Sequence, residues 1–125
     1  MNMVNPEFEI IFYATENGKE PAKEFLKSLN AKVRAKVARY LDCLSQNGTN
    51  LREPYTKNLT NGIFELRVKS DNDNIRILYF FYIGKRIVLT NGFIKKSRKT
   101  PRRELELALR HKSEYLSRGE KNEHF

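Results

Sequence analysis

The chain has 125 residues, of which 39% are hydrophobic and 11% aromatic, and this length suits one compact domain with a single core. The formal net charge of +9 arises in residues 57–118, where 15 lysines and arginines outnumber 6 acidic residues, while the charges of the other segments cancel. A single cysteine excludes an intrachain disulfide, and no apolar run approaches the roughly 18 to 20 residues of a membrane-spanning helix, so we expect a cytoplasmic protein with no membrane partner.

The first half of the chain reads as one strand followed by two helices. Hydrophobic residues alternate over about residues 7–13, which is the period of a strand. Pro21 suits the first turn of a short helix that runs to about Leu29. Asn30 can cap a second helix with an apolar stripe, and Gly48 can end that helix in a left-handed conformation. Two helices with almost no loop between them predict a hairpin that packs on a sheet.

The second half reads as three strands and a last helix. Residues 51–61 are polar and rich in turn formers, so we interpret them as a connection. Residues 64–69 alternate between apolar and charged side chains, whereas residues 74–82 are apolar on both faces apart from Arg76, which predicts a central strand. A further strand spans about residues 86–94. Thr100 and Pro101 then open the final helix as a cap and a first-turn proline.

These elements predict an α+β fold with the order βααβββα. We expect an antiparallel sheet of about four strands, packed against the helical hairpin and the C-terminal helix. One domain would span residues 1–118. Residues 119–125 are polar and are expected to form a frayed tail.

A cluster of cations follows the last predicted strand, with no carboxylate among them. Lysine and arginine contacts to phosphates give strong, salt-sensitive binding, and local clustering of charge is the signature of such a surface. The alternative is that the surface is merely basic and soluble. The six cations of the cluster are Lys95, Lys96, Arg98, Lys99, Arg102 and Arg103.

The spacing of the first two strands of this half places two arginines opposite each other. If residues 70–73 form a four-residue loop, Lys69 faces Asn74 and Arg67 faces Arg76 on the same face of the sheet. Two opposed arginines repel unless an anion or a carboxylate lies between them. The register therefore predicts either a phosphate site or a surface ladder that Glu65 or Asp73 neutralises.

The next turn brings a lysine to the same patch. A two-residue turn at Gly84-Lys85 would pair Ile83 with Arg86, and by the same count Asn74 would face Lys95. Arg67, Arg76 and Lys95 would then converge. A register slip of one residue would destroy this convergence, because it turns every side chain to the other face.

The residues quoted above resemble a known family of small proteins. The segments 62–67 (Gly-Ile-Phe-Glu-Leu-Arg), 75–80 and 89–101 are similar to the toxins of the RelE/ParE superfamily, and nearly the whole chain resembles its phage-derived, HigB-like branch. The most specific element is the Gly-Phe-x-Lys-Lys-x-x-x-Thr-Pro pattern of residues 92–101. The resemblance implies a toxin of a type II toxin-antitoxin module that cuts messenger RNA on the ribosome. Its partner would be an antitoxin of the helix-turn-helix type, encoded nearby.

The implied chemistry suits the cationic residues. RNA is cleaved by its own 2′-hydroxyl when an enzyme removes that proton, stabilises charge on phosphorus and protonates the leaving 5′-oxygen, so no metal or other cofactor is expected. Arg67 and Arg76 are candidates for holding the phosphate. Lys95 or Lys96 is a candidate acid or base, because neighbouring cations lower a lysine pKa. The RNA backbone would contact Lys57, Arg98, Lys99, Arg102 and Arg103.

Other candidate groups are read as structural. In the RelE branch a tyrosine donates a proton shortly after the basic pair, but here the nearest later tyrosine is Tyr115, so the general acid stays unassigned. A lone helical cysteine such as Cys43 is usually a packing residue. His111 is read as solvated, and His124 lies near the chain end. The histidines and the cysteine have no zinc-ligand spacing.

Two alternatives to the nuclease stay open from the sequence. One is a ParE-like toxin that binds DNA gyrase and performs no chemistry. The other is a noncatalytic RNA-binding module. Convergence of Arg67, Arg76, Lys95 and Lys96 on one patch favours the nuclease, because a gyrase binder has no need of convergent phosphate ligands.

Overall fold

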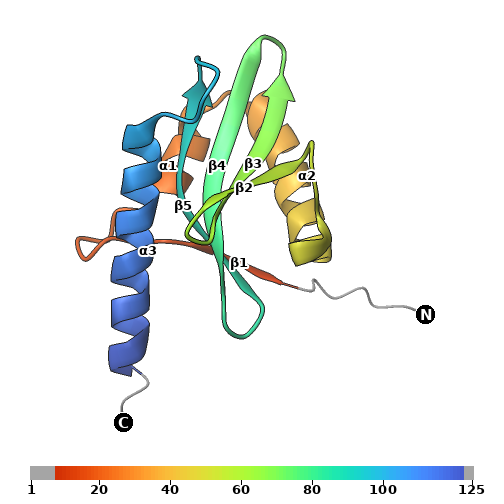
Figure 1. The fold of residues 1–125 in the computed structure, drawn as a ribbon. Coiled ribbons are helices and arrows are strands. Elements are labelled where there is room, and N and C mark those ends of the chain that lie inside the picture. The colour runs from red at the N-terminus through yellow and green to blue at the C-terminus, as the bar shows by residue number, and fades with distance from the viewer. Residues whose placement is uncertain (1–7, 123–125) are drawn as a thin grey trace.

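The computed structural model describes residues 8–122, so Glu7 and His124 lie outside the described residues (Figure 1). The described chain forms one continuous mixed α and β structure. Its elements are β1 (Glu9–Phe12), α1 (Pro21–Ser28), α2 (Ala31–Asn47), the 3-10 helix η1 (Gly48–Asn50), β2 (Thr56–Thr60), β3 (Ile63–Ser70), β4 (Asp73–Tyr82), β5 (Arg86–Lys95) and α3 (Arg102–Asn122).

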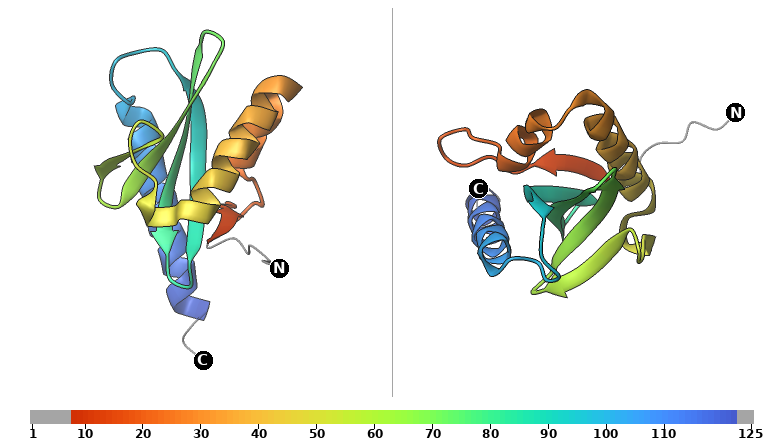
Figure 2. Two further views of the ribbon diagram at one scale, coloured as in Figure 1. Left: turned by 90° about the vertical axis from the view of Figure 1, so that its right-hand side faces the viewer. Right: turned by 90° about the horizontal axis from the view of Figure 1, so that it is seen from above.

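The sheet is the middle of three layers. Helices α1 and α2 cover one face and α3 crosses the other, as the two views of Figure 2 show. Alternating residues of each strand therefore enter two different cores. Leu66 and Ile77 belong to the core beneath α1 and α2, whereas Ile63 and Phe80 belong to the core beneath α3. The expected α+β class and the expected central place of β4 are both confirmed.

The prediction of about four antiparallel strands is wrong. The sheet has five strands in the order β1-β5-β4-β3-β2, and it is mixed because β1 pairs with β5 in parallel. A period of two marks β1 as a strand but carries no information about its neighbour. The chain enters the sheet beside β5, crosses over through α1 and α2, and re-enters at the opposite edge as β2.

The fifth strand is β2, which lies within the segment predicted to be a connection. It is polar because it forms an edge of the sheet, and most of its side chains are exposed. A tight turn at Asn61 and Gly62, both with positive φ (48° and 80°), joins β2 to β3 and pairs Thr60 with Ile63. Asn-Gly is a strong hairpin signal, which the reading of composition alone overlooked.

The helical hairpin agrees with its predicted caps. The side chain of Asn30 accepts a hydrogen bond from the amide of Val33 at 2.9 Å, and Pro21 is the first residue of α1. Gly48 ends α2 with φ of 52°. A Cβ atom there would lie 2.0 Å from the ring of Phe8, so glycine is required both by the backbone and by this close approach.

The predicted register at the basic end of the sheet is confirmed, although by a different route. Arg67 pairs with Arg76, and Asn74 pairs with Lys95. The β4–β5 turn is one residue longer than predicted and pairs Tyr82, rather than Ile83, with Arg86. A β-bulge then shifts the pairing back by one residue between Tyr79–Leu89 and Leu78–Asn91.

The C-terminal helix is longer than predicted. Helix α3 runs to Asn122, so residues 119–122 are helical rather than frayed, and residues 123–125 lie outside the described part. It begins at Arg102, and the hydroxyl of Thr100, expected to cap it, instead donates to Glu65 at 2.6 Å. Within residues 8–122, none of the helices combines the length and the apolar character needed to cross a membrane.

Candidate functional site

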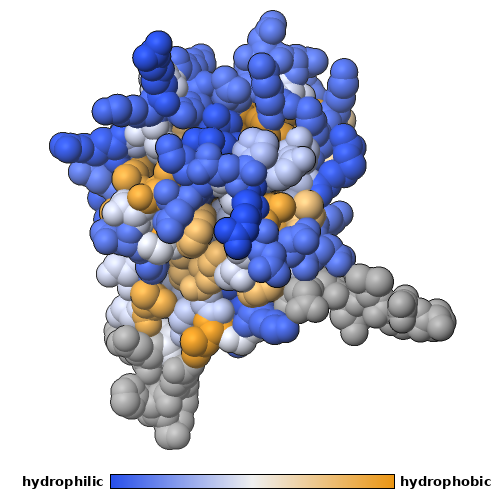
Figure 3. All heavy atoms as spheres, turned by 45° about the vertical axis from the view of Figure 1, so that its right-hand side comes forward, coloured by the Kyte–Doolittle hydropathy of each residue, from blue (hydrophilic) through white to orange (hydrophobic). Residues whose placement is uncertain are grey.

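Five of the nine predicted site residues line a cleft of about 250 Å³, which we call the basic cleft. Strands β2, β3 and β5 and the loop before α3 form it, at the end of the molecule where hydrophilic side chains gather at the top of Figure 3. No carboxylate is among the described residues that line it. The lining residues are Lys57, Asn58, Leu59, Arg67, Lys95, Arg98, Lys99, Thr100 and Leu105.

A buried carboxylate lies beneath the cleft. The side chain of Glu65 is fully buried (0% exposed) and accepts a hydrogen bond from Nε of Arg67 at 3.1 Å. The same oxygen lies 3.6 Å from Nε of Arg76, and the other oxygen accepts the hydroxyl of Thr100. Glu65 therefore compensates the repulsion between the opposed arginines and ties the loop before α3 to the sheet.

The two arginines differ in their access to a ligand. The side chain of Arg67 is 24% exposed and lines the cleft, whereas that of Arg76 is 12% exposed and lies behind it. Arg76 donates to the carbonyl of Ile75 at 3.1 Å, and burial lowers its pKa, with the nearby charge of Glu65 acting in the opposite direction. Arg67 is consequently the arginine placed to meet a phosphate, and Arg76 supports the base of the cleft.

The two predicted proton carriers also occupy different places. Lys95 lines the basic cleft, and its pKa lies below the usual value because of desolvation and the positive charges of Arg76, Arg67 and Lys57, against which Glu65 acts. Lys96 is exposed and faces a neighbouring hollow that also contains Lys95 and the β3–β4 turn. A lysine with a lowered pKa in a cleft can exchange protons more readily than a fully solvated one.

The predicted RNA-backbone residues separate into two groups. Lys57, Arg98 and Lys99 are exposed and line the basic cleft. Arg102 and Arg103 are exposed on the first turn of α3, outside the cleft lining. The first group can contact a bound phosphate directly, whereas the second extends the positive surface beyond the cleft.

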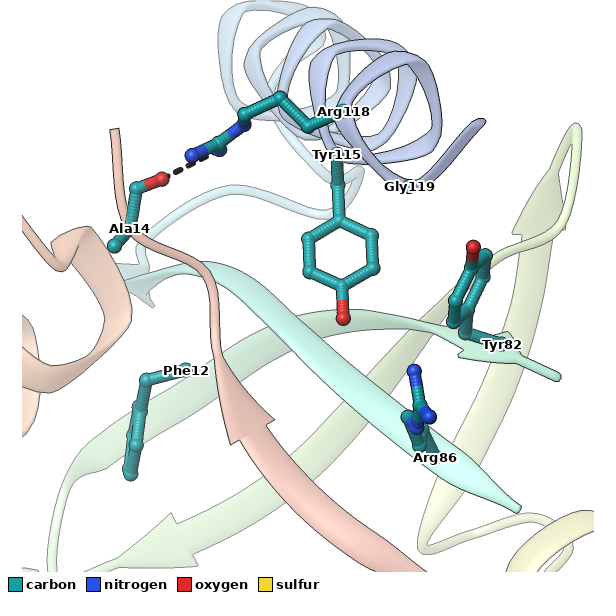
Figure 4. A pocket seen from close by; sticks show the side chains of 7 residues that line it. All are labelled: Phe12, Ala14, Tyr82, Arg86, Tyr115, Arg118 and Gly119. Carbon is teal, nitrogen blue, oxygen red and sulfur yellow. Dashed lines mark hydrogen bonds between the residues drawn. The ribbon is translucent and has the colours of Figure 1, made fainter. Parts of the chain in front are cut away.

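A larger hollow of about 450 Å³ lies at the other end of the sheet (Figure 4). Its cations are already engaged, since Arg118 donates to the carbonyl of Ala14 at 2.6 Å and Arg86 packs over the ring of Tyr82. The hydroxyl of Tyr115 points into this hollow, and its ring packs edge-on against Tyr82. Tyr115 is therefore far from the basic cleft and is no candidate for proton donation there.

The remaining candidates have structural environments. His111, predicted to be solvated, is buried and stacks on Tyr13 with ring centroids 4.4 Å apart, and burial lowers its pKa. Cys43, predicted to pack, is exposed. Tyr79 and Phe80 are core residues. The described residues contain no group of three or more histidines, cysteines or carboxylates that could hold a metal.

The full burial of Glu65 and its bond to Thr100 are the features that the sequence did not reveal. The predicted alternative, in which Glu65 or Asp73 neutralises the two arginines, is confirmed for Glu65, which the register places beside Arg67 and diagonal to Arg76. The burial of Glu65 could not be predicted from the sequence, because it depends on how the loop before α3 folds over the sheet.

Comparison with known proteins identifies the family of the chain. A family model described as "Phage derived protein Gp49-like (DUF891)" matches residues 24–113, which include every residue that lines the basic cleft. No curated protein matches the chain. The matched segment covers most of the sequence, and we conclude that the chain belongs to the phage-derived Gp49-like family, which is a family of RelE-like toxins.

Proposed function

We propose that this protein is the toxin of a type II toxin-antitoxin module and that it cleaves messenger RNA on the ribosome without a metal ion. Membership of a toxin-like family supports the first part. The observation that carries the second part is the basic cleft itself, where five cationic side chains, those of Lys57, Arg67, Lys95, Arg98 and Lys99, surround a space lined by no carboxylate among the described residues.

The cleft suits attack by the 2′-hydroxyl of the RNA on the adjacent phosphate. The 2′-oxygen loses its proton and bonds to phosphorus, while the bond to the 5′-oxygen breaks and that oxygen gains a proton. Arg67 would hold the phosphate oxygens and stabilise their growing charge, because a guanidinium can donate to two oxygens at once. Arg76 and Glu65 would keep Arg67 in place rather than touch the reacting phosphate.

Lys95 is the better supported of the two proposed proton carriers. It lines the cleft and its pKa lies below the usual lysine value, so its amine gives up and accepts a proton more readily than that of a fully solvated lysine. Lys96, together with Arg98 and Lys99, would bind the neighbouring phosphates.

The proposed partner is an antitoxin of the helix-turn-helix type, encoded nearby, as in the HigB-like branch. Such a partner would inhibit the toxin by laying carboxylates over the basic cleft. The local excess of positive charge supports this proposal, since residues 57–118 carry 15 cationic and 6 acidic side chains.

Brief induction of the protein in cells, followed by mapping of the 5′ ends of messenger RNA, tests the nuclease. We expect new 5′-hydroxyl ends within translated regions. Arg67→Ala should lower the cleavage rate roughly a hundredfold to a thousandfold, as loss of one donor to a transition-state oxyanion typically does. The matched control is Arg39→Ala, an exposed arginine of α2, which should leave cleavage unchanged.

A supercoiling assay with purified DNA gyrase separates the nuclease from the gyrase-binding alternative. The proposal fails if the folded Arg67→Ala protein stays as toxic as the parent while gyrase is inhibited. Binding of ribosomes without new RNA ends would instead support a noncatalytic RNA-binding module.

A further inference from the structure

A further hollow, of about 260 Å³, opens beside the basic cleft, and we call it the tyrosine hollow. Arg67 lines both spaces, so they are neighbours across one side chain. The strand register explains the arrangement, because Arg67 pairs with Arg76 and the next pair on the same face is Lys69 with Asn74. The lining residues are Tyr40, Pro54, Tyr55, Arg67, Lys69, Asn74 and Arg76.

Tyr55 is fixed beside Arg67 by the backbone. It immediately precedes β2, and its carbonyl accepts a hydrogen bond from the amide of Arg67 at 2.8 Å. Its ring meets the ring of Tyr40 edge-on, with centroids 6.1 Å apart and an interplanar angle of 63°. Tyr55 is nevertheless 47% exposed, which makes it one of the two exposed large hydrophobic residues among those described.

Burial in a core does not explain this tyrosine. An edge-on contact with one other ring leaves ring surface of Tyr55 in solvent, next to the cations Arg67 and Lys69. No carboxylate is among the described residues that line the hollow. Aromatic side chains interleaved with cations are the composition that proteins use to stack unpaired bases while holding the phosphates of the same strand.

We propose that the tyrosine hollow is a nucleobase subsite, in which the ring of Tyr55 stacks on a base of the RNA strand whose phosphate occupies the basic cleft. This inference rests on the proposed function and extends it from phosphate binding to base binding. Arg67 lies between the two spaces and would separate the stacked base from the reacting phosphate. The volume is several times the roughly 30 Å³ share of one water molecule, so a flat ring can enter.

The test uses a short RNA in which every 2′-hydroxyl is methylated, so that it binds without being cleaved. Tyr55→Ala should weaken its binding roughly 5- to 150-fold, the range that loss of one base–aromatic stack produces. Tyr55→Phe should bind as the parent does, since the ring is kept. Removing the base from one nucleotide at a time should identify one position at which Tyr55→Ala has no further effect.

The salt dependence of the same binding separates stacking from charge. Arg67→Ala should lower the slope of log affinity against log salt by about 0.7, whereas Tyr55→Ala should leave that slope unchanged. Tyr82→Ala, in the hollow of Figure 4, is the matched control and should leave RNA affinity unchanged. Unfolding curves should show that Tyr55→Ala is as stable as the parent.

Three outcomes would overturn the inference. If Arg67→Ala weakens binding but Tyr55→Ala does not, the base subsite is wrong and the proposed function stands. If Tyr55→Ala weakens binding of poly-glutamate as much as binding of RNA, the tyrosine hollow is a protein-binding surface. If the parent binds the methylated RNA neither free nor on purified ribosomes, the base subsite and the proposed function fail together.

Discussion

At the scale of single residues, Glu65 connects stability to function. It is the only carboxylate that the described structure places against both Arg67 and Arg76, and it is fully buried. A buried charge is tolerated only when partners compensate its loss of water. Glu65 and the two arginines compensate one another in this way. Arg67, the arginine nearer the surface, is thereby held at the proposed phosphate-binding position, while the deeper Arg76 completes the charge balance.

Glu65→Gln should therefore destabilise the fold. It leaves two arginines without their carboxylate, and removal of one member of a buried ion pair costs about 3 to 5 kcal/mol. Urea denaturation measures the loss of unfolding free energy. Glu106→Gln, an exposed residue of α3, serves as control and should change it by less than about 0.5 kcal/mol.

A double variant tests the cause of this loss. Glu65→Gln combined with Arg76→Gln should lose less stability than the sum of the single losses, because the second change removes a charge that the first left uncompensated. Additive losses would show that the ion pair with Arg76 is energetically unimportant.

At the scale of elements, the sequence predicted best what alternation alone determines. Alternation assigns Arg67, Arg76 and Lys95 to faces of their strands, and that convergence is present. The β4–β5 turn and the β-bulge each shift the pairing of the two strands by one residue, and the two shifts cancel. Counting residues along two strands gives the right partners when two such shifts cancel. The register at the basic end was therefore predicted correctly, although neither the longer turn nor the bulge was.

Features that depend on distant partners could not be predicted in this way. The parallel partner of β1 is decided by where the helical hairpin returns the chain. The edge strand β2 has neither the apolar alternation of a strand buried on one face nor the continuous apolar run of a strand covered on both faces, although its Asn61-Gly62 turn was visible in the sequence. The burial of Glu65 depends on the loop that carries Thr100.

The contact between Tyr13 and α3 should make the stability of the fold depend on pH in the alkaline range. Tyr13 donates to Glu114 of α3 and stacks on His111, and burial, followed by the hydrogen bond and charge of Glu114, raises the pKa of Tyr13 to about 12 from 10.0. The unfolded chain loses this proton near pH 10 while the folded chain keeps it. The stabilisation is therefore complete below pH 10 and is lost as the pH rises to about 12.

Tyr13→Phe should remove this pH dependence together with the hydrogen bond. At pH 8 the variant should be less stable than the parent by about 1 kcal/mol. Between pH 10 and 12 its unfolding free energy should fall less steeply than that of the parent, and the two slopes should differ by up to about 1.4 kcal/mol per pH unit. Urea denaturation at several pH values measures both effects. The exposed Tyr55→Phe is the control, and equal slopes for Tyr13→Phe and the parent would show that Tyr13 does not couple α3 to pH.

At the scale of the whole molecule, charge and architecture are segregated together. The segment that supplies β2 to β5 and most of α3 carries the entire excess of +9, whereas the helical hairpin belongs to a nearly neutral first half. Cations on the hairpin thus contribute to the net charge of the protein but lie away from the basic cleft. This separation allows long-range attraction to be distinguished from direct phosphate contact.

Two triple variants with the same net charge provide the distinction. Arg98, Lys99 and Arg102, all changed to alanine, remove exposed cations in and beside the basic cleft, while the control changes the exposed Lys27, Lys32 and Arg39 of the hairpin. Each triple lowers the formal charge by three. The measurement is binding to purified ribosomes over a series of salt concentrations.

The cleft triple should reduce the slope of log affinity against log salt by about 2 to 3, because each lost phosphate contact releases one fewer set of condensed counterions. The hairpin triple should slow association slightly at low salt through its smaller net charge and leave the slope unchanged. Equal reductions would mean that net charge alone governs binding, and the basic cleft would then lose its proposed role as the contact surface for RNA.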